Sequence, residues 1–250
     1  MTCRRDAVMI GVMITLAADT STSYNSVVLC DGETVLAESV VKAGRRHSER
    51  LMATVDWILA EAATPLDSVE LLAISQGPGS FTGLRVGIAA WKGLALANGL
   101  PLAGVPTLDA MARSAIFHRG LICPLLDARM SEIFGAVYES DGAAIRKRSD
   151  DRVGPIGAFL EGLEDGVLFL GDGALLYRET IQSLSPGALF APDAYSAPRA
   201  SNVALEGLAL LASGAASDGA AIDAVYLRKS QAEEARNASN PETAARRETA

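Results

Sequence analysis

The sequence is poor in the residues that build metal sites and disulfide frameworks. Its 250 residues include two histidines, His47 and His118, and three cysteines, Cys3, Cys30 and Cys123. The cysteines are far apart, and none forms a Cys-x-x-Cys pair. Because structural zinc sites and disulfide scaffolds need clustered or paired ligands, the sequence argues against both. This cysteine usage fits a reducing compartment, and we expect a cytoplasmic protein.

Basic charge is also scarce. Lysine and arginine number 22 against 30 aspartates and glutamates, a net charge of −8. A protein that grips a phosphate backbone on its own normally carries a basic patch or stripe. We therefore do not expect this chain to bind nucleic acid on its own.

Long apolar runs are missing. The run from Ala7 to Ala18 holds 12 residues, too few to span a bilayer, so we expect no membrane segment. It follows Arg4-Arg5 and resembles a secretory signal, although Asp6 interrupts the basic region. The alternative that we favour places the true start at Met9 or Met13, which makes residues 1 to 12 an extension of the gene model.

Alternating apolar runs and turn signals predict a mixed α/β domain in the first half. Asp31-Gly32 is typical of a two-residue hairpin, and Gly99 closes a long apolar helix. We expect strands over 14–18, 26–30, 34–41, 69–75 and 102–105, and helices from Ser48 to Ala62, over 80–98 and over 107–117.

The second half repeats part of this pattern. The strand 121–127 ends in an aspartate, as 14–19 does, and Asp141-Gly142 follows it as Asp31-Gly32 follows the first. Either chance or two related lobes explains this. Further expected elements are strands 133–138, 167–170 and 224–227, and helices up to 163, from 171 and over 200–213. Residues 230–250 lack large apolar side chains and are predicted to be disordered.

The most distinctive segment is the glycine-rich stretch from Gln76 to Gly87. A glycine-rich turn before a helix suits an anion, but this one matches neither the Walker A pattern nor Gly-x-Gly-x-x-Gly. The helix that follows has small residues at three- and four-residue steps, which favours a close contact with the protein's own sheet or with a partner. The candidate interface comprises Gly83, Gly87, Ala90, Leu94 and Ala97, with Leu51 and Val55 of the preceding helix.

Residues that could catalyse a reaction are few. His47 and His118 lie in charged or connecting stretches, and no serine or cysteine has a nucleophile-elbow pattern. Asp19 and Asp127 end strands and could serve a metal or a phosphate, but forming turns is the preferred interpretation. We predict no catalytic, cofactor-binding or metal-binding residue.

Several motifs together resemble the bacterial TsaB family. They are Leu16-Ala17-Ala18-Asp19-Thr20-Ser21, residues 43–49, the signature over 77–87, Lys92-Gly93-Leu94-Ala95 and residues 104–110, with weaker matches at 125–129 and 225–228. The resemblance implies the fold of actin, sugar kinases and heat-shock chaperone ATPases. The expected parts are an extension over 1–13, lobes over 14–118 and 119–229, and a tail over 230–250.

The resemblance also implies a function. The family's catalytic paralogue, TsaD, carries a metal-binding His-x-x-x-His pair, which falls here on Thr107 and Met111. Neither side chain supplies an imidazole. The implied role is a non-catalytic scaffold that pairs with a TsaD-like subunit through first-lobe helices, a surface shared with a homodimer, and that a TsaE-like ATPase joins. Together they transfer threonylcarbamoyl to adenosine 37 of tRNAs reading codons that begin with A. The alternatives are an ATP-dependent kinase or a metallopeptidase of the same superfamily.

Overall fold

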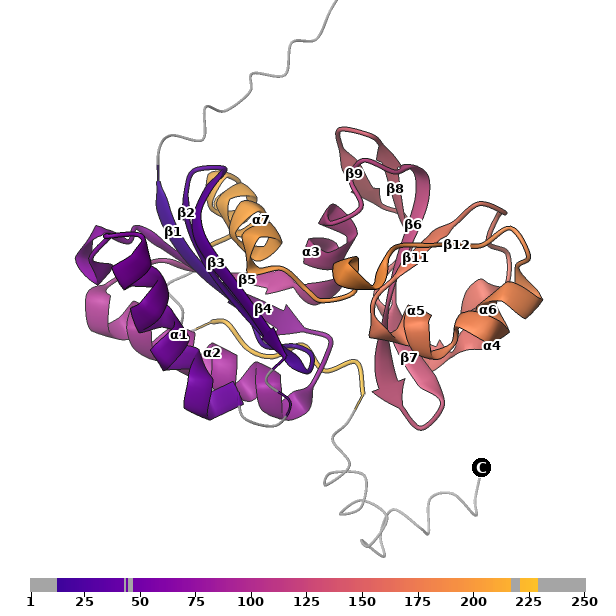
Figure 1. The fold of residues 1–250 in the computed structure, drawn as a ribbon, viewed down its shortest axis with the longest axis horizontal. Coiled ribbons are helices and arrows are strands. Elements are labelled where there is room, and N and C mark those ends of the chain that lie inside the picture. The colour runs from indigo at the N-terminus through magenta and orange to yellow at the C-terminus, as the bar shows by residue number, and fades with distance from the viewer. Residues whose placement is uncertain (1–12, 43, 45–46, 217–220, 229–250) are drawn as a thin grey trace, which may run out of the picture.

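A computed structural model describes residues 13–42, 44, 47–216 and 221–228, which form two lobes side by side (Figure 1). Each lobe contains a mixed β-sheet with helices packed against it. This arrangement confirms the α/β class and the two-lobed actin-like fold that the resemblance implies. The interpretations of residues 1 to 12 and the disorder predicted for 230–250 lie outside the described residues.

The first sheet has five strands in the order β3-β2-β1-β4-β5. Its strands are β1 Ile14–Asp19, β2 Tyr24–Asp31, β3 Thr34–Lys42, β4 Leu71–Gly77 and β5 Leu102–Pro106. The hairpin predicted at Asp31-Gly32 joins β2 to β3, and both pairings of β2 are antiparallel. β1, β4 and β5 run parallel, because helical crossovers connect β3 to β4 and β4 to β5.

Helices cover both faces of this sheet. α1, His47–Glu61, and α2, Phe81–Asn98, pack on one face around Leu16, Leu72 and Trp91. α7, Ala200–Ala212, packs on the other face, where Val203 and Ala204 meet Ala73. α3, Thr107–Arg113, follows β5 and leads into the second lobe. Two short 3-10 turns lie at Leu66–Ser68 and Asp193–Tyr195.

The position of α7 corrects the expected lobe boundaries. Residues 119–229 do not form one continuous second lobe, because α7 returns to the first sheet and buries its apolar face there. Gly207 lies so close to Ala73 that a Cβ at this position would be 2.6 Å from the Ala73 side chain. The apolar composition of 200–213 predicts a helix, but it cannot show which sheet the helix covers.

The second sheet has seven strands and three short helices. Its strands are β6 Arg119–Arg129, β7 Glu132–Gly135, β8 Tyr138–Asp141, β9 Ile145–Lys147, β10 Arg152–Pro155, β11 Leu168–Leu170 and β12 Leu189–Phe190, and its helices are α4 Ile156–Leu160, α5 Asp172–Leu176 and α6 Arg178–Leu184. β6 is the central strand, with antiparallel β7 and β8 along different parts of its length and parallel β11 beside it.

The strand pairing supports two related lobes. β1 lies between an antiparallel hairpin partner and parallel β4, and β6 likewise lies between antiparallel partners and parallel β11. Each central strand has an aspartate at or near its end, Asp19 as the last residue of β1 and Asp127 two residues before the end of β6. The repeat seen in the sequence therefore corresponds to a repeated strand order.

Three predicted elements differ from the structure. The helix predicted over 107–117 ends at Arg113 and continues as turns. The strand predicted over 133–138 is two strands, because β7 and β8 pair with different parts of β6. The predicted strand 224–227 is irregular, and Val225 donates a 2.7 Å backbone hydrogen bond to the carbonyl of Gln76.

Residues 222–228, which we call the C-terminal strap, connect the two lobes. Ile222 packs into the first-lobe core beside α2, whereas Leu227 packs against the second-lobe core. Tyr226 stacks on Phe81 at 4.8 Å between ring centroids. The strap thus runs from α2 to the second lobe (Figure 1).

Candidate partner surface

Two glycines of α2, Gly83 and Gly87, face Thr20 in the loop between β1 and β2. Ser80 caps the helix, and its Oγ accepts a 3.3 Å hydrogen bond from the Gly83 amide. Thr20 donates its hydroxyl to the Gly83 carbonyl at 2.8 Å. A Cβ at Gly83 would collide with the carbonyl oxygen of Thr20, and one at Gly87 would collide with the Thr20 hydroxyl. These glycines allow α2 to approach the β1–β2 loop.

The candidate interface predicted from the sequence is therefore corrected at four positions. Gly83 and Gly87 are buried against the first lobe, and Leu51 and Val55 belong to its core beneath α1. A side chain with no exposed surface cannot contact a partner in this conformation. Of the remaining three, Ala90 and Leu94 are partly buried beside that core and Ala97 is exposed.

A different set of small and apolar side chains faces outward from the same two helices. Leu96 is 88% exposed, and a Cβ added at Gly93 would meet nothing within 4 Å. We define the α1–α2 surface as Met52, Ala60, Ala89, Gly93, Leu96 and Ala97, all exposed. Because α2 has small residues on several faces, the three- and four-residue spacing alone did not separate this face from the buried one.

The strand-end aspartates shape turns. Asp19 Oδ1 accepts hydrogen bonds from the amide and the hydroxyl of Ser21, at 3.0 and 2.9 Å. Asp127 Oδ1 accepts the amide of Arg129 at 2.8 Å, again two residues ahead. Both are Asx-type contacts, in which a carboxylate replaces a backbone acceptor. The interpretation that Asp19 and Asp127 form turns is therefore confirmed.

Burial has the largest effect on the ionisation of Asp19. Its side chain is buried, and burial raises the pKa of its carboxyl above the ordinary value, against the hydrogen bonds from Ser21 that lower it. Burial likewise raises the pKa of the Cys30 thiol to about 12, with Glu38 adding to the effect. Cys30 is therefore a protonated, unreactive core residue at neutral pH.

The two positions at which the resemblance places the histidine pair of the paralogue hold buried core residues. Thr107 and Met111 lie on α3 with almost no exposed surface, and Met111 packs with Leu126 and Leu170 of the second lobe. Neither side chain provides an imidazole. Among the described residues, no group of three histidine, cysteine, aspartate or glutamate side chains is arranged to share a metal ion.

The glycine-rich turn between β4 and α2 makes its contacts with other segments of the same chain. The Ser80 amide donates to the Ser21 carbonyl at 2.6 Å, and a Cβ at Gly79 would collide with that same carbonyl. A Cβ at Gly77 would lie 2.6 Å from the carbonyl oxygen of Val225 in the C-terminal strap. The turn packs between the β1–β2 loop and the strap, as expected for a tight connection.

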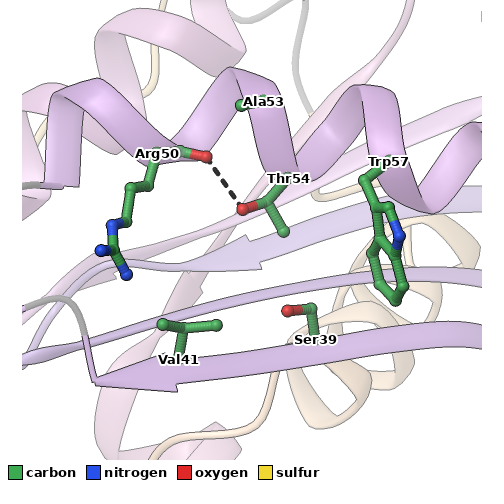
Figure 2. Close-up of a pocket in the computed structure, with 6 residues that line it drawn as sticks. All are labelled: Ser39, Val41, Arg50, Ala53, Thr54 and Trp57. Carbon is green, nitrogen blue, oxygen red and sulfur yellow. Dashed lines mark hydrogen bonds between the residues drawn. The ribbon is translucent and has the colours of Figure 1, made fainter.

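A second exposed feature lies on the opposite flank of α1. A groove between α1 and the edge strand β3 is lined by Ser39, Val41, Arg50, Ala53, Thr54 and Trp57 (Figure 2). Trp57 is 50% exposed. Figure 2 shows its ring hanging from α1 beside Ser39, with Arg50 near Val41 at the other end. The sequence patterns did not identify Arg50 or Trp57 as candidate site residues.

Comparisons with known proteins agree with the two-lobed fold. Residues 39–236 match the family model of TsaD, tRNA N6-adenosine threonylcarbamoyltransferase. The chain is 28% identical to YeaZ from Pseudomonas aeruginosa, whose solved structure matches with a TM-score of 0.75 over 86% of this chain and all of that one. Within the described residues, no helix is long and apolar enough to cross a membrane.

Two curated relatives are named tRNA threonylcarbamoyladenosine biosynthesis protein TsaB. The Bacillus subtilis protein is 29% identical over 78% of this chain and 87% of its own length. The Escherichia coli protein is 41% identical over 50% of this chain, and the match spans 55% of its length. The higher identity is thus confined to about half of each chain.

Proposed function

Because this chain belongs to the threonylcarbamoyltransferase family, and within it to the TsaB branch, we propose that it is a non-catalytic subunit of tRNA threonylcarbamoyladenosine synthesis. In this role it pairs with a TsaD-like catalytic subunit and assembles with a TsaE-like ATPase. The complex modifies adenosine 37 of tRNAs that read codons beginning with A, and this subunit touches tRNA only through its partners.

The observation that carries the proposal is the α1–α2 surface. Leu96 projects into solvent, and Gly93 leaves open space beside it, so the backbone of a partner helix can approach closely. Exposed apolar side chains next to small residues mark surfaces that other proteins cover. A first-lobe helix pair of a related subunit fits such a surface, and so does a second copy of this chain.

The buried sites support a non-catalytic role. Thr107 and Met111 are core residues, and the amide of Ser80 in the glycine-rich turn is bonded to the β1–β2 loop. A kinase needs such a turn to hold phosphates, and a metallopeptidase needs several ligands on one ion. The residues at both places instead pack against this chain itself.

The decisive experiment places a charge on the α1–α2 surface. Leu96→Arg changes an exposed side chain, so the free energy of unfolding should stay within about 0.5 kcal/mol of the wild type. Co-purification with the TsaD-like subunit should be lost. Leu184→Arg is the matched control, because Leu184 is exposed on α6 in the other lobe. Equal recovery of the complex with both variants would contradict the proposed surface.

A second experiment separates the subunit from an enzyme. The purified chain should form no threonylcarbamoyladenosine with tRNA, ATP and the activated donor threonylcarbamoyl-adenylate. Adding the catalytic and ATPase subunits should transfer the threonylcarbamoyl group from this donor to the tRNA, releasing AMP, and mass spectrometry measures the modified nucleoside. Calorimetry with ATP and Mg²⁺ should show no micromolar binding to the isolated chain. Tight ATP binding would favour the kinase alternative, and stoichiometric zinc in the purified protein would favour the peptidase.

A further inference from the structure

The outer edge of the first sheet is open and apolar. β3 is the last strand in the sheet order, so its outer backbone groups pair with no strand among the described residues. No residue of β3 is buried, and Val35 and Leu36 are 45% and 42% exposed. Proteins usually blunt such an edge with a proline, a bulge or a central lysine. The pairing of β3 with β2 is irregular at Leu36, but it is regular from Ala37 to Val41, and this part of β3 contains no proline or lysine.

The edge is continuous with the groove on α1. Alternate β3 side chains point to the α1 face, which is why Ser39 and Val41 form the floor of the groove while Glu38 contacts Arg199 on the other face. Arg50 and Trp57 of α1 overhang that floor (Figure 2). The groove is open to solvent and has a volume of about 320 Å³, room for a few side chains beside the strand.

The charge of the groove indicates what could occupy it. Arg50 is the only charged residue in its lining, and it forms no ion pair with any residue that the structure describes. A cation and an exposed aromatic ring therefore stand at opposite ends of the groove, in a chain whose net charge is −8 (Figure 2). This combination complements a carboxylate and an apolar side chain, presented together along an extended backbone.

We propose that β3 and the α1 groove bind an extended acidic peptide segment of a partner protein by strand addition. The peptide backbone pairs with the free edge of β3. An apolar side chain packs on Trp57, and a carboxylate two residues away, roughly 7 Å along the strand, reaches Arg50. The site is separate from the α1–α2 surface, so both can be occupied at once.

The test uses the full chain and fluorescein-labelled decapeptides of alternating serine and valine with one leucine and, two residues from it, one glutamate. Two peptides carry these residues in opposite orders and so cover both strand directions. Saturable binding of one peptide, measured by anisotropy, should accompany a shift of Trp57 emission that Trp57→Ala removes. Buried Trp91 should not respond.

Charge and backbone are tested separately. Arg50→Glu should weaken binding of the glutamate peptide by about tenfold and strengthen binding of a peptide with lysine at the same position. The matched control Arg146→Glu on β9 should change neither affinity. N-methylation of the peptide amides in one alternate frame should abolish binding, and methylation in the other frame should leave it intact. Leu96→Arg should bind the peptide normally, because it alters only the α1–α2 surface.

Three results would overturn the proposal. The first is no saturable binding of either peptide, and the second is equal loss in both N-methylated frames, which would exclude strand pairing. The third is concentration-dependent self-association of the chain that Leu36→Lys abolishes together with peptide binding, because the occupant of the edge would then be a second copy.

Discussion

At the residue scale, single side-chain contacts explain why small residues recur in this chain. Gly83 and Gly87 leave room for Thr20, and Gly207 leaves room for Ala73. In contrast, Gly93 has open space around it. The same residue type on one helix therefore serves internal packing at two positions and an external surface at a third.

Alanine substitutions should distinguish these two uses of glycine. Gly83→Ala places a methyl group against the carbonyl of Thr20, and we expect the free energy of unfolding to fall by about 1–3 kcal/mol. Gly93→Ala meets no atom and improves helix propensity, so it should raise stability by up to ~1 kcal/mol. Urea denaturation measures both. A Gly83→Ala protein as stable as the wild type would contradict the packing described here.

The carboxyl of Asp19 should make stability depend on pH. Because burial raises its native pKa above that of the unfolded chain, the native state holds this proton more tightly. The associated stability is present below about pH 4, the unfolded pKa of an aspartate, and is lost as the pH rises through the raised native pKa.

Asp19→Asn removes that titration while keeping an oxygen that can accept the Ser21 amide. Relative to this variant, the wild type should lose stability progressively as the pH rises from about 4 through the raised native pKa of Asp19. Urea denaturation at several pH values between 3 and 8 measures the difference. A difference that stays constant over this range would show that Asp19 has the same pKa in both states.

At the element scale, the sequence predicted most helices and strands but not their partners. Asp31-Gly32, Gly99 and the alternating strands are local signals, and the structure places a hairpin, a helix end and strands there. The face of α2 that meets solvent is set by tertiary packing. Small residues lie on several faces of α2, so spacing alone selected the buried glycines as the interface.

The groove on α1 had an even weaker signal. Trp57 and Arg50 belong to an amphipathic helix, and nothing in their spacing shows that β3 ends the sheet beside them. Sheet order depends on pairings between residues far apart in the chain. The prediction of a strand over 224–227 was wrong for a related reason, because Ala224 packs against the first-lobe core and Leu227 against the second-lobe core, and the segment joins neither sheet.

The attachment of α7 to the first sheet gives a prediction for Glu38. Its carboxylate on β3 accepts hydrogen bonds from Arg199 at 2.6 Å and from the amide and hydroxyl of Ser201 at 3.1 and 3.0 Å. Glu38→Ala leaves the first-turn amide of Ser201 without this acceptor and should lower the free energy of unfolding by about 1–3 kcal/mol. The control Glu33→Ala changes an exposed side chain. Equal denaturation midpoints would show that this contact does not hold α7.

At the scale of the whole molecule, two lobes of similar strand order are joined by more than the chain between β5 and β6. α3 carries Asp109, which accepts a 2.6 Å hydrogen bond from Tyr138 on β8 and pairs with Lys147 on β9 at 2.7 Å. The C-terminal strap adds a second connection, because it packs on α2 and ends at the β6–β7 hairpin. α2 thus contributes both to the α1–α2 surface and to this second connection between the lobes.

The strap should couple the β6–β7 hairpin to the first lobe. Arg228 donates a 3.3 Å hydrogen bond to the carbonyl of Ala128 and lies 3.4 Å from the carboxylate of Glu132, at the two ends of the hairpin turn. Arg228→Ala removes both contacts but keeps the stacking of Tyr226 on Phe81. Amide hydrogen exchange over residues 128–132 should therefore become faster, while exchange in α2 stays unchanged. Arg146→Ala, on exposed β9, is the control. If exchange increases across both lobes alike, Arg228 supports global stability, and if it increases nowhere, the strap does not restrain the hairpin.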